Sequence, residues 1–78
     1  MAEYSVVLLD KNEFEIASCL INGLPNAKKQ ARYLLSDAYA VAVETTHDDL
    51  GTHKVEIRDA AGECLFDAFR LSPANAAA

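Results

Sequence analysis

The sequence predicts an α+β fold of two layers, in which an antiparallel sheet of about four strands packs on one long helix. Three observations lead to this prediction. Two short apolar segments separated by a polar turn open the chain, a long stretch with helical periodicity follows, and two apolar segments around a glycine turn close it. The predicted order along the chain is therefore ββαββ.

The length and composition are those of one small folded domain. The chain has 78 residues, of which 51% are hydrophobic and 24% are charged, and a chain of this size supports a single small core. We expect residues 1–71 to form the domain. We expect residues 72–78 to form a flexible tail, because no large apolar side chain follows Leu71.

The charge balance and the cysteine content limit the class of protein. A net charge of −5 opposes general binding to nucleic acids. The two cysteines, Cys19 and Cys64, are too few for a disulfide-stapled secreted scaffold, and the amino terminus lacks the basic region of a secretory signal. No apolar run reaches the roughly 18 residues of a membrane span. These features predict a cytoplasmic protein with reduced cysteines and no membrane partner.

The first apolar segment, residues 4–9, is rich in β-branched and leucine side chains and predicts a strand. The next segment, residues 13–22, fits two structures. A strand would place Ile16 and Leu20 on one face, whereas a helix would gather Ile16, Ala17 and Leu20 in one stripe. We favour the strand, because the polar turn between the two segments lets it pair with the first strand and cover its edge.

A single long helix is predicted from residue 26 to about residue 49. Small and apolar side chains recur at helical spacing almost throughout this range, and Gly51 stands where a left-handed residue commonly ends a helix. A kink is expected near Ser36, where a new N-cap can begin. The rival interpretation is a strand within residues 39–46, because its first five residues also alternate with a strand's period.

The carboxy-terminal segments predict a hairpin, because residues 59–62 are typical of a type I turn that ends in a left-handed glycine and a bulge. The register that we expect pairs Ile57 with Leu65 and turns both toward the helix. It turns three other side chains away from the helix: Cys64, Phe66 and Ala68.

An apolar patch on the outer sheet face follows from this register. One helix covers only one face, and soluble monomers seldom leave a large apolar patch bare. The function that we expect is therefore a non-catalytic protein-interaction module, homodimeric or bound to another protein through Cys64, Phe66 and Ala68. The alternative is that the sheet twists strongly and the carboxy-terminal tail, or Phe69 with Leu71, covers the patch.

The chain's one compact basic cluster comprises Lys28, Lys29 and Arg32, in the first turns of the predicted helix. Free backbone N–H groups at a helix start favour anions. The cluster is therefore our candidate for binding a phosphate or a nucleic acid, as the alternative function. The simpler interpretation is a solvated helix face whose cations pair with Glu13 or Glu15.

The sequence around the cluster, LPNAKKQARYLL, resembles the start of the carboxy-terminal helix of double-stranded-RNA-binding domains, where a basic run meets phosphates. Lys28, Lys29 and Arg32 occupy the matching basic positions. Those domains begin with a helix and place three strands before the last helix, whereas this chain predicts two strands before its helix. The resemblance is therefore confined to this segment and does not assign the chain to that family.

No catalytic site or metal site is predicted. Glu44 and His47 are three residues apart, a spacing found in some helical metal sites, but the chain has no second copy of that motif. Its three glycines lie far apart, so there is no glycine-rich phosphate loop. We expect no enzyme activity, no cofactor and no metal.

Overall fold

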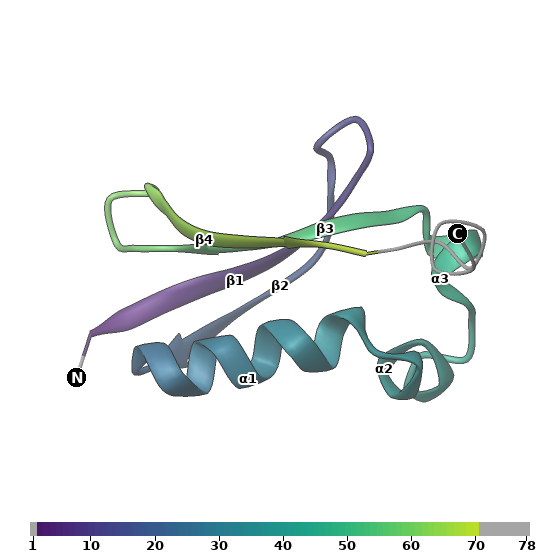
Figure 1. Cartoon of the computed structure of the whole chain (residues 1–78), viewed down its shortest axis with the longest axis horizontal. Helices are drawn as coiled ribbons and strands as arrows, with labels where there is room; N and C mark the ends of the chain where they lie inside the picture. Colours follow the sequence, from purple (N-terminus) through teal and green to yellow (C-terminus); the bar gives the residue numbers. More distant parts are fainter. Residues whose placement is uncertain (1, 71–78) are drawn as a thin grey trace.

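The computed structural model describes residues 2–70 and is an α+β fold with a four-stranded antiparallel sheet (Figure 1). The predicted tail, residues 72–78, lies outside the described residues. The elements, in chain order, are β1 (Glu3–Asp10), β2 (Glu15–Asn22), α1 (Leu24–Leu35), α2 (Asp37–Ala42), α3 (His47–Leu50), β3 (Thr52–Arg58) and β4 (Cys64–Phe69). None of these helices has both the length and the apolar character needed to cross a membrane.

The strands stand in the order β2-β1-β3-β4, and all neighbouring pairs are antiparallel. The strand β2 is therefore parallel to β3, and β1 lies between them. The connection from β2 to β3 contains all three helices, so α1 crosses one face of the sheet (Figure 1). This arrangement is a split β-α-β unit with one additional edge strand, β4.

The prediction of a strand after the first turn is confirmed, because β2 pairs with β1 along its length. The turn between them is held by Asp10, whose Oδ1 accepts hydrogen bonds from the backbone N–H groups of Asn12 and Phe14, each at 2.9 Å. Both glycine turns also form as expected. Gly51 ends α3 with φ of 73°, and Gly62 closes the β3–β4 turn with φ of 83°, values that glycine adopts at little cost.

The prediction of a single long helix was wrong, because the structure has three shorter helices in this stretch. The chain breaks at Ser36, where φ and ψ are −80° and 157°, and the Ser36 side chain caps the next helix by accepting from the N–H of Tyr39. A second break follows α2, where Glu44 has φ of 60° and Thr46 caps α3. Two local caps therefore win over the continuous helical periodicity. The rival strand within residues 39–46 does not form either.

The main core lies between α1 and the inner face of the sheet, the face that α1 covers. Its buried members from the helix are Ala27, Ala31 and Leu34. Its buried members from the two central strands are Val6, Leu8, Val55 and Ile57. The small alanines let the helix approach the sheet closely, and the larger residues of β1 and β3 fill the space between them.

The register predicted for the hairpin was wrong by one residue over most of β4. Ile57 is opposite Phe66, and Val55 is opposite Ala68, whereas Arg58 remains opposite Cys64. The extra residue, Leu65, sits in a bulge.

Because opposite residues point to the same face, Phe66 and Ala68 face the helix side rather than away from it. Ala68 accordingly packs against the core. Cys64 lies opposite Arg58 on the outer face, as predicted, and Leu65 borders the same face.

A candidate interaction surface along strand β4

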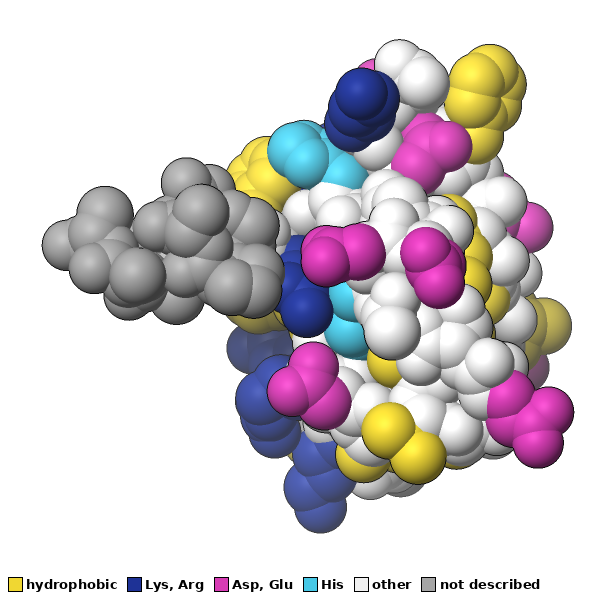
Figure 2. All heavy atoms as spheres, turned by 90° about the vertical axis from the view of Figure 1, so that its right-hand side faces the viewer, with side chains coloured by type: hydrophobic (Ala, Val, Ile, Leu, Met, Phe, Trp, Pro, Cys, Tyr) yellow, Lys and Arg dark blue, Asp and Glu magenta, His cyan; other side chains and the backbone are white. Residues whose placement is uncertain are grey.

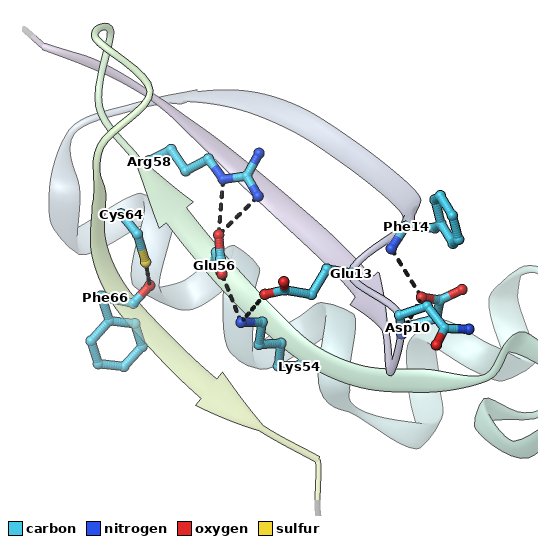
Figure 3. A network of polar contacts seen from close by, with 9 residues as sticks. Asp10, Glu13, Phe14, Lys54, Glu56, Arg58, Cys64 and Phe66 are labelled. Atoms are coloured by element: carbon cyan, nitrogen blue, oxygen red, sulfur yellow. Dashed lines mark hydrogen bonds and ion pairs between the residues drawn. The ribbon is translucent and has the colours of Figure 1, made fainter.

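The outer face of the sheet carries a network of ion pairs. Lys54 Nζ lies 3.0 Å from Glu13 Oε1 and 2.9 Å from Glu56 Oε2. Glu56 Oε1 accepts from Arg58 at 2.9 Å. Figure 3 shows these four side chains in front of the sheet, with the helices behind it.

This network covers apolar residues that α1 cannot reach. Val7 and Leu9 point to the outer face, since they alternate with the inner residues of β1, yet both are buried. Leu9 is opposite Lys54, and Val7 is opposite Glu56. The aliphatic stems of the charged side chains therefore lie over the outer half of β1.

The ion pairs shift the pKa values of two of their members, Glu56 and Lys54, in the expected directions. Hydrogen bonding to Lys54 holds the pKa of the Glu56 carboxyl below its ordinary value, although burial opposes this. Hydrogen bonding to Glu56, and then to Glu13, raises the pKa of Lys54. Glu56 and Lys54 therefore both stay charged near neutral pH.

The rest of the outer face is a shallow open hollow of about 940 Å³. Its walls include Leu20 from β2 and Leu65 from β4, with the turn at residues 59–62 at one end and Ser5 and Ser18 among the polar groups. The continuous apolar patch predicted for this face is therefore absent from the described residues. It is replaced by an ion network on one part and a mixed polar hollow on the other.

The strand β4 is an edge of the sheet with free backbone groups. The N–H of Arg70 donates to the carbonyl of His53 at 2.8 Å, which continues the β3–β4 ladder. Alternate residues of an antiparallel pair direct both backbone groups to the neighbouring strand. Residues out of step with Arg70, namely Asp67 and Phe69, therefore direct theirs to the open side. No strand within residues 2–70 pairs with that side.

The side chains along this edge are apolar and accessible. Leu65, Phe66 and Phe69 are 48%, 41% and 55% exposed. In Figure 3 the Phe66 ring lies outside the ribbon of β4. The strand contains no lysine, proline or glycine, the residues that commonly protect an edge from pairing, and its single charged residue is Asp67.

The basic cluster adjoins this edge. Lys28 Nζ lies 5.6 Å from the centroid of the Phe66 ring, in the range of a cation–π contact. Arg32 is one helical turn further along and shares the helix side of Lys28. Lys29 is rotated by about 100° from Lys28, toward solvent. The opposite side of α1 faces β2, where burial raises the pKa of the Cys19 thiol.

Among residues 2–70, none of the three cations forms an ion pair. The two carboxylates predicted to pair with them do not do so: Glu13 pairs with Lys54, and Glu15 pairs with no cation in the part of the chain that the structure describes. Lys28, Lys29 and Arg32 are all exposed. Two sets of sequence-predicted residues, the basic cluster and the interface residue Phe66, therefore meet in one surface. We call the open edge of β4, together with Lys28 and Arg32, the β4 surface.

Of Glu44 and His47, the two residues with the spacing of a helical metal site, His47 has a structural role. His47 is buried, and its ring nitrogens lie 2.8 Å from the Thr52 hydroxyl and 2.8 Å from the Ser36 carbonyl. It thus ties α3 to the end of α1 and to β3. No group of three or more His, Cys, Asp or Glu among residues 2–70 gathers as a metal site. Figure 2 shows the α2–α3 end, where acidic side chains are scattered and most of the visible basic ones gather along one side.

Both cysteines are free thiols, and Cys64 is exposed. Its Sγ lies 3.4 Å from the carbonyl oxygen of Phe66, at the bulge that sets the register of β4.

Comparison of the chain with protein-family models, with curated proteins and with solved structures gave no match. The β4 surface therefore rests on its own geometry as the candidate functional site.

Proposed function

We propose that this chain is a non-catalytic protein-interaction module that accepts an extended segment of another protein along β4. The observation that carries the proposal is the open edge of β4, with three apolar side chains exposed beside it. An extended segment that adds to a sheet edge gains main-chain hydrogen bonds, and pockets for alternate side chains give it specificity.

The edge is a better candidate than the outer face that the sequence suggested. Phe66 and Ala68 point toward the helix side, so they cannot form a patch on the outer face. Only Cys64 of the three predicted interface residues points outward. At the edge, by contrast, Phe66 on one face and Leu65 on the other both lie within reach of a fifth strand, which would stand about 4.8 Å from β4.

The expected complex is transient. A segment of about five residues makes a few main-chain hydrogen bonds, each worth about 0.5–1.5 kcal/mol net, and its side chains cover part of Leu65, Phe66 and Phe69. The ordering of a flexible segment opposes this gain. Interfaces of such small area belong to the weak, exchanging class.

The sharpest test uses a backbone donor. Asp67 directs its N–H to the open side, so Asp67→Pro removes an edge donor without removing a bond to β3. The experiment selects extended peptides from a random library on the full chain and measures their affinities by amide NMR titration. We expect the shifts to centre on residues 65–69, and we expect Asp67→Pro to weaken binding at least tenfold while Asp67→Ala does not.

Two further variants keep the proposal testable if Asp67→Pro does not fold. Leu65→Glu and Phe69→Glu place charges on the edge without altering its backbone, and circular dichroism checks that each variant keeps the fold. Peptides that bind all three variants as well as the unmodified chain, or whose shifts map to β2, would refute the proposal.

The alternative functions predict different results. A homodimer through β4 would appear in sedimentation velocity as a concentration-dependent dimer that Asp67→Pro abolishes. A phosphate or nucleic-acid binder would bind a short RNA at low salt, with affinity falling steeply as salt rises.

A further inference from the structure

We infer that the segment bound by the β4 surface is acidic, with carboxylates at alternate positions on the side that faces α1. This inference rests on the proposed function, because it describes the chemistry of the same site. It starts from the contact between Lys28 and Phe66, which places a cation beside the open edge.

The geometry of α1 concentrates charge on its β4 side. The residues at one helical turn, Lys28 and Arg32, lie one above the other. Figure 1 shows α1 and β4 running in the same direction, so a step from Lys28 to Arg32 follows the edge of the sheet. The four-residue step from Lys28 to Arg32 advances about 6 Å along the helix, close to the spacing of two strand residues on one face.

An added strand would therefore present every second side chain to this pair of cations. A carboxylate at two consecutive positions on that side matches the spacing of Lys28 and Arg32. Neither cation has an ion-pair partner among residues 2–70. Charge complementarity of this kind supplies specificity and speeds association more than it adds affinity.

The side chains of the bound segment that point to the outer face would meet apolar residues rather than cations. Leu65 and Phe69 border it on the outer face of β4, with Asp67 between them. Apolar side chains at the intervening positions of the segment would contact these two residues. The sequence class that fits is thus an alternation of acidic and apolar residues in an extended conformation.

A second copy of the chain fits this surface less well. Its own β4 would present Phe66 and Ala68 on the helix side, and neither supplies a carboxylate. Pairing two β4 strands through a twofold axis would also bring two basic helix sides toward each other. Nucleic acid is opposed by the net charge of −5.

The test compares three synthetic peptides on the full chain. Their cores are Glu-Val-Glu-Ile-Glu, the same sequence with glutamine in place of glutamate, and the same with lysine. We expect the glutamate peptide to bind about 2- to 30-fold more tightly than the glutamine peptide, from two exposed ion pairs. The lysine peptide should bind most weakly. The difference should shrink as salt rises.

Matched variants locate the effect. Lys28→Gln combined with Arg32→Gln should abolish the preference for glutamate and leave affinity for the glutamine peptide nearly unchanged. Lys29→Gln removes the same charge at a position directed toward solvent and should leave the preference intact. A preference that depends on Lys29 as strongly as on Lys28 would reduce the inference to general electrostatics and overturn it.

The outcomes also separate this inference from the proposed function. If the glutamate and glutamine peptides bind β4 equally, and Asp67→Pro weakens both, the interaction module stands and the acidic partner does not. If library selection yields no peptide that depends on the β4 edge, the proposed function itself fails. Tighter binding of a short RNA than of the glutamate peptide, or dimerisation through β4, would overturn the inference.

Discussion

The two faces of the sheet bury apolar residues by different means. On the inner face, Val6 and Leu8 are fully buried beneath α1. On the outer face, Val7 and Leu9 are buried almost as completely, yet the cover above them consists of charged side chains from β3. A single helix therefore suffices for this sheet, because the stems of Lys54 and Glu56, which are opposite Leu9 and Val7, cover what the helix leaves.

The difference also concerns how the two covers respond to solution conditions. The inner cover depends on apolar burial, which changes little with pH or salt. The outer cover depends on carboxylates and cations that hold one another in place. The stability that the inner face contributes should thus depend little on pH, whereas the stability that the outer face contributes should depend on the charges of the side chains that cover it.

The largest expected effects come from shortening the buried leucines of β1. Leu8→Ala and Leu9→Ala should each destabilise the fold by about 2–5 kcal/mol, because both leucines are at most 2% exposed. Urea unfolding measures both values. A loss of stability below about 1 kcal/mol for Leu9→Ala alone would contradict the similarity of the two faces, since it would mean that the charged side chains do not bury Leu9 as α1 buries Leu8.

A smaller loss is expected when the shared carboxylate is removed. Glu56→Gln should destabilise the fold by about 1–3 kcal/mol, because Arg58 loses its partner and Lys54 retains only Glu13. Urea unfolding at low salt measures the change. Glu63→Gln, which alters an exposed carboxylate in the β3–β4 turn, serves as the control and should change stability by less than about 0.5 kcal/mol.

The apolar stem of Lys54 can be separated from its charge. Lys54→Met keeps most of the stem over Leu9 and removes the charge, whereas Lys54→Ala removes both. We expect Lys54→Met to melt at a higher temperature than Lys54→Ala, with both shifts smaller than that of Leu9→Ala. Equal melting temperatures would show that the stem covers nothing, and calorimetry distinguishes the cases.

The smallest expected effect is a dependence of stability on pH. Because the pKa of Glu56 is lowered in the folded state, its contribution is present above its ordinary value of 4.5 and is lost as the pH falls through the lower, folded value. Stability should therefore decline in acid, and Glu56→Gln should flatten this decline. Urea unfolding at a series of pH values checks it, and an unchanged slope in Glu56→Gln would contradict the assignment.

The sequence was sufficient for the elements that depend on local chemistry. Gly51 and Gly62 stand at left-handed turn positions, and the polar turn after β1 directs β2 back along it. The sequence was insufficient where two local signals compete. The helical periodicity continues past Ser36, but the capping side chain there ends one helix and begins another.

The candidate site depended on one residue of register. The bulge at Leu65 reverses the faces of the following side chains, since a strand alternates with a period of two. The prediction contained the bulge at the glycine turn but not this second one, so it put Phe66 on the outer face and separated it from Lys28. The two candidate surfaces were therefore predicted as unrelated, and only the three-dimensional arrangement joins them.

The order of strands in the sheet has a consequence for how the chain reaches its native state. Each pair β1–β2 and β3–β4 is a hairpin of near neighbours, whereas the central pairing of β1 with β3 joins segments that are far apart in the sequence. Bringing these two segments together lowers the entropy of the intervening chain before stabilising contacts form. We therefore expect the docking of the two hairpins, with α1 packing across the face that they form together, to limit the rate of folding.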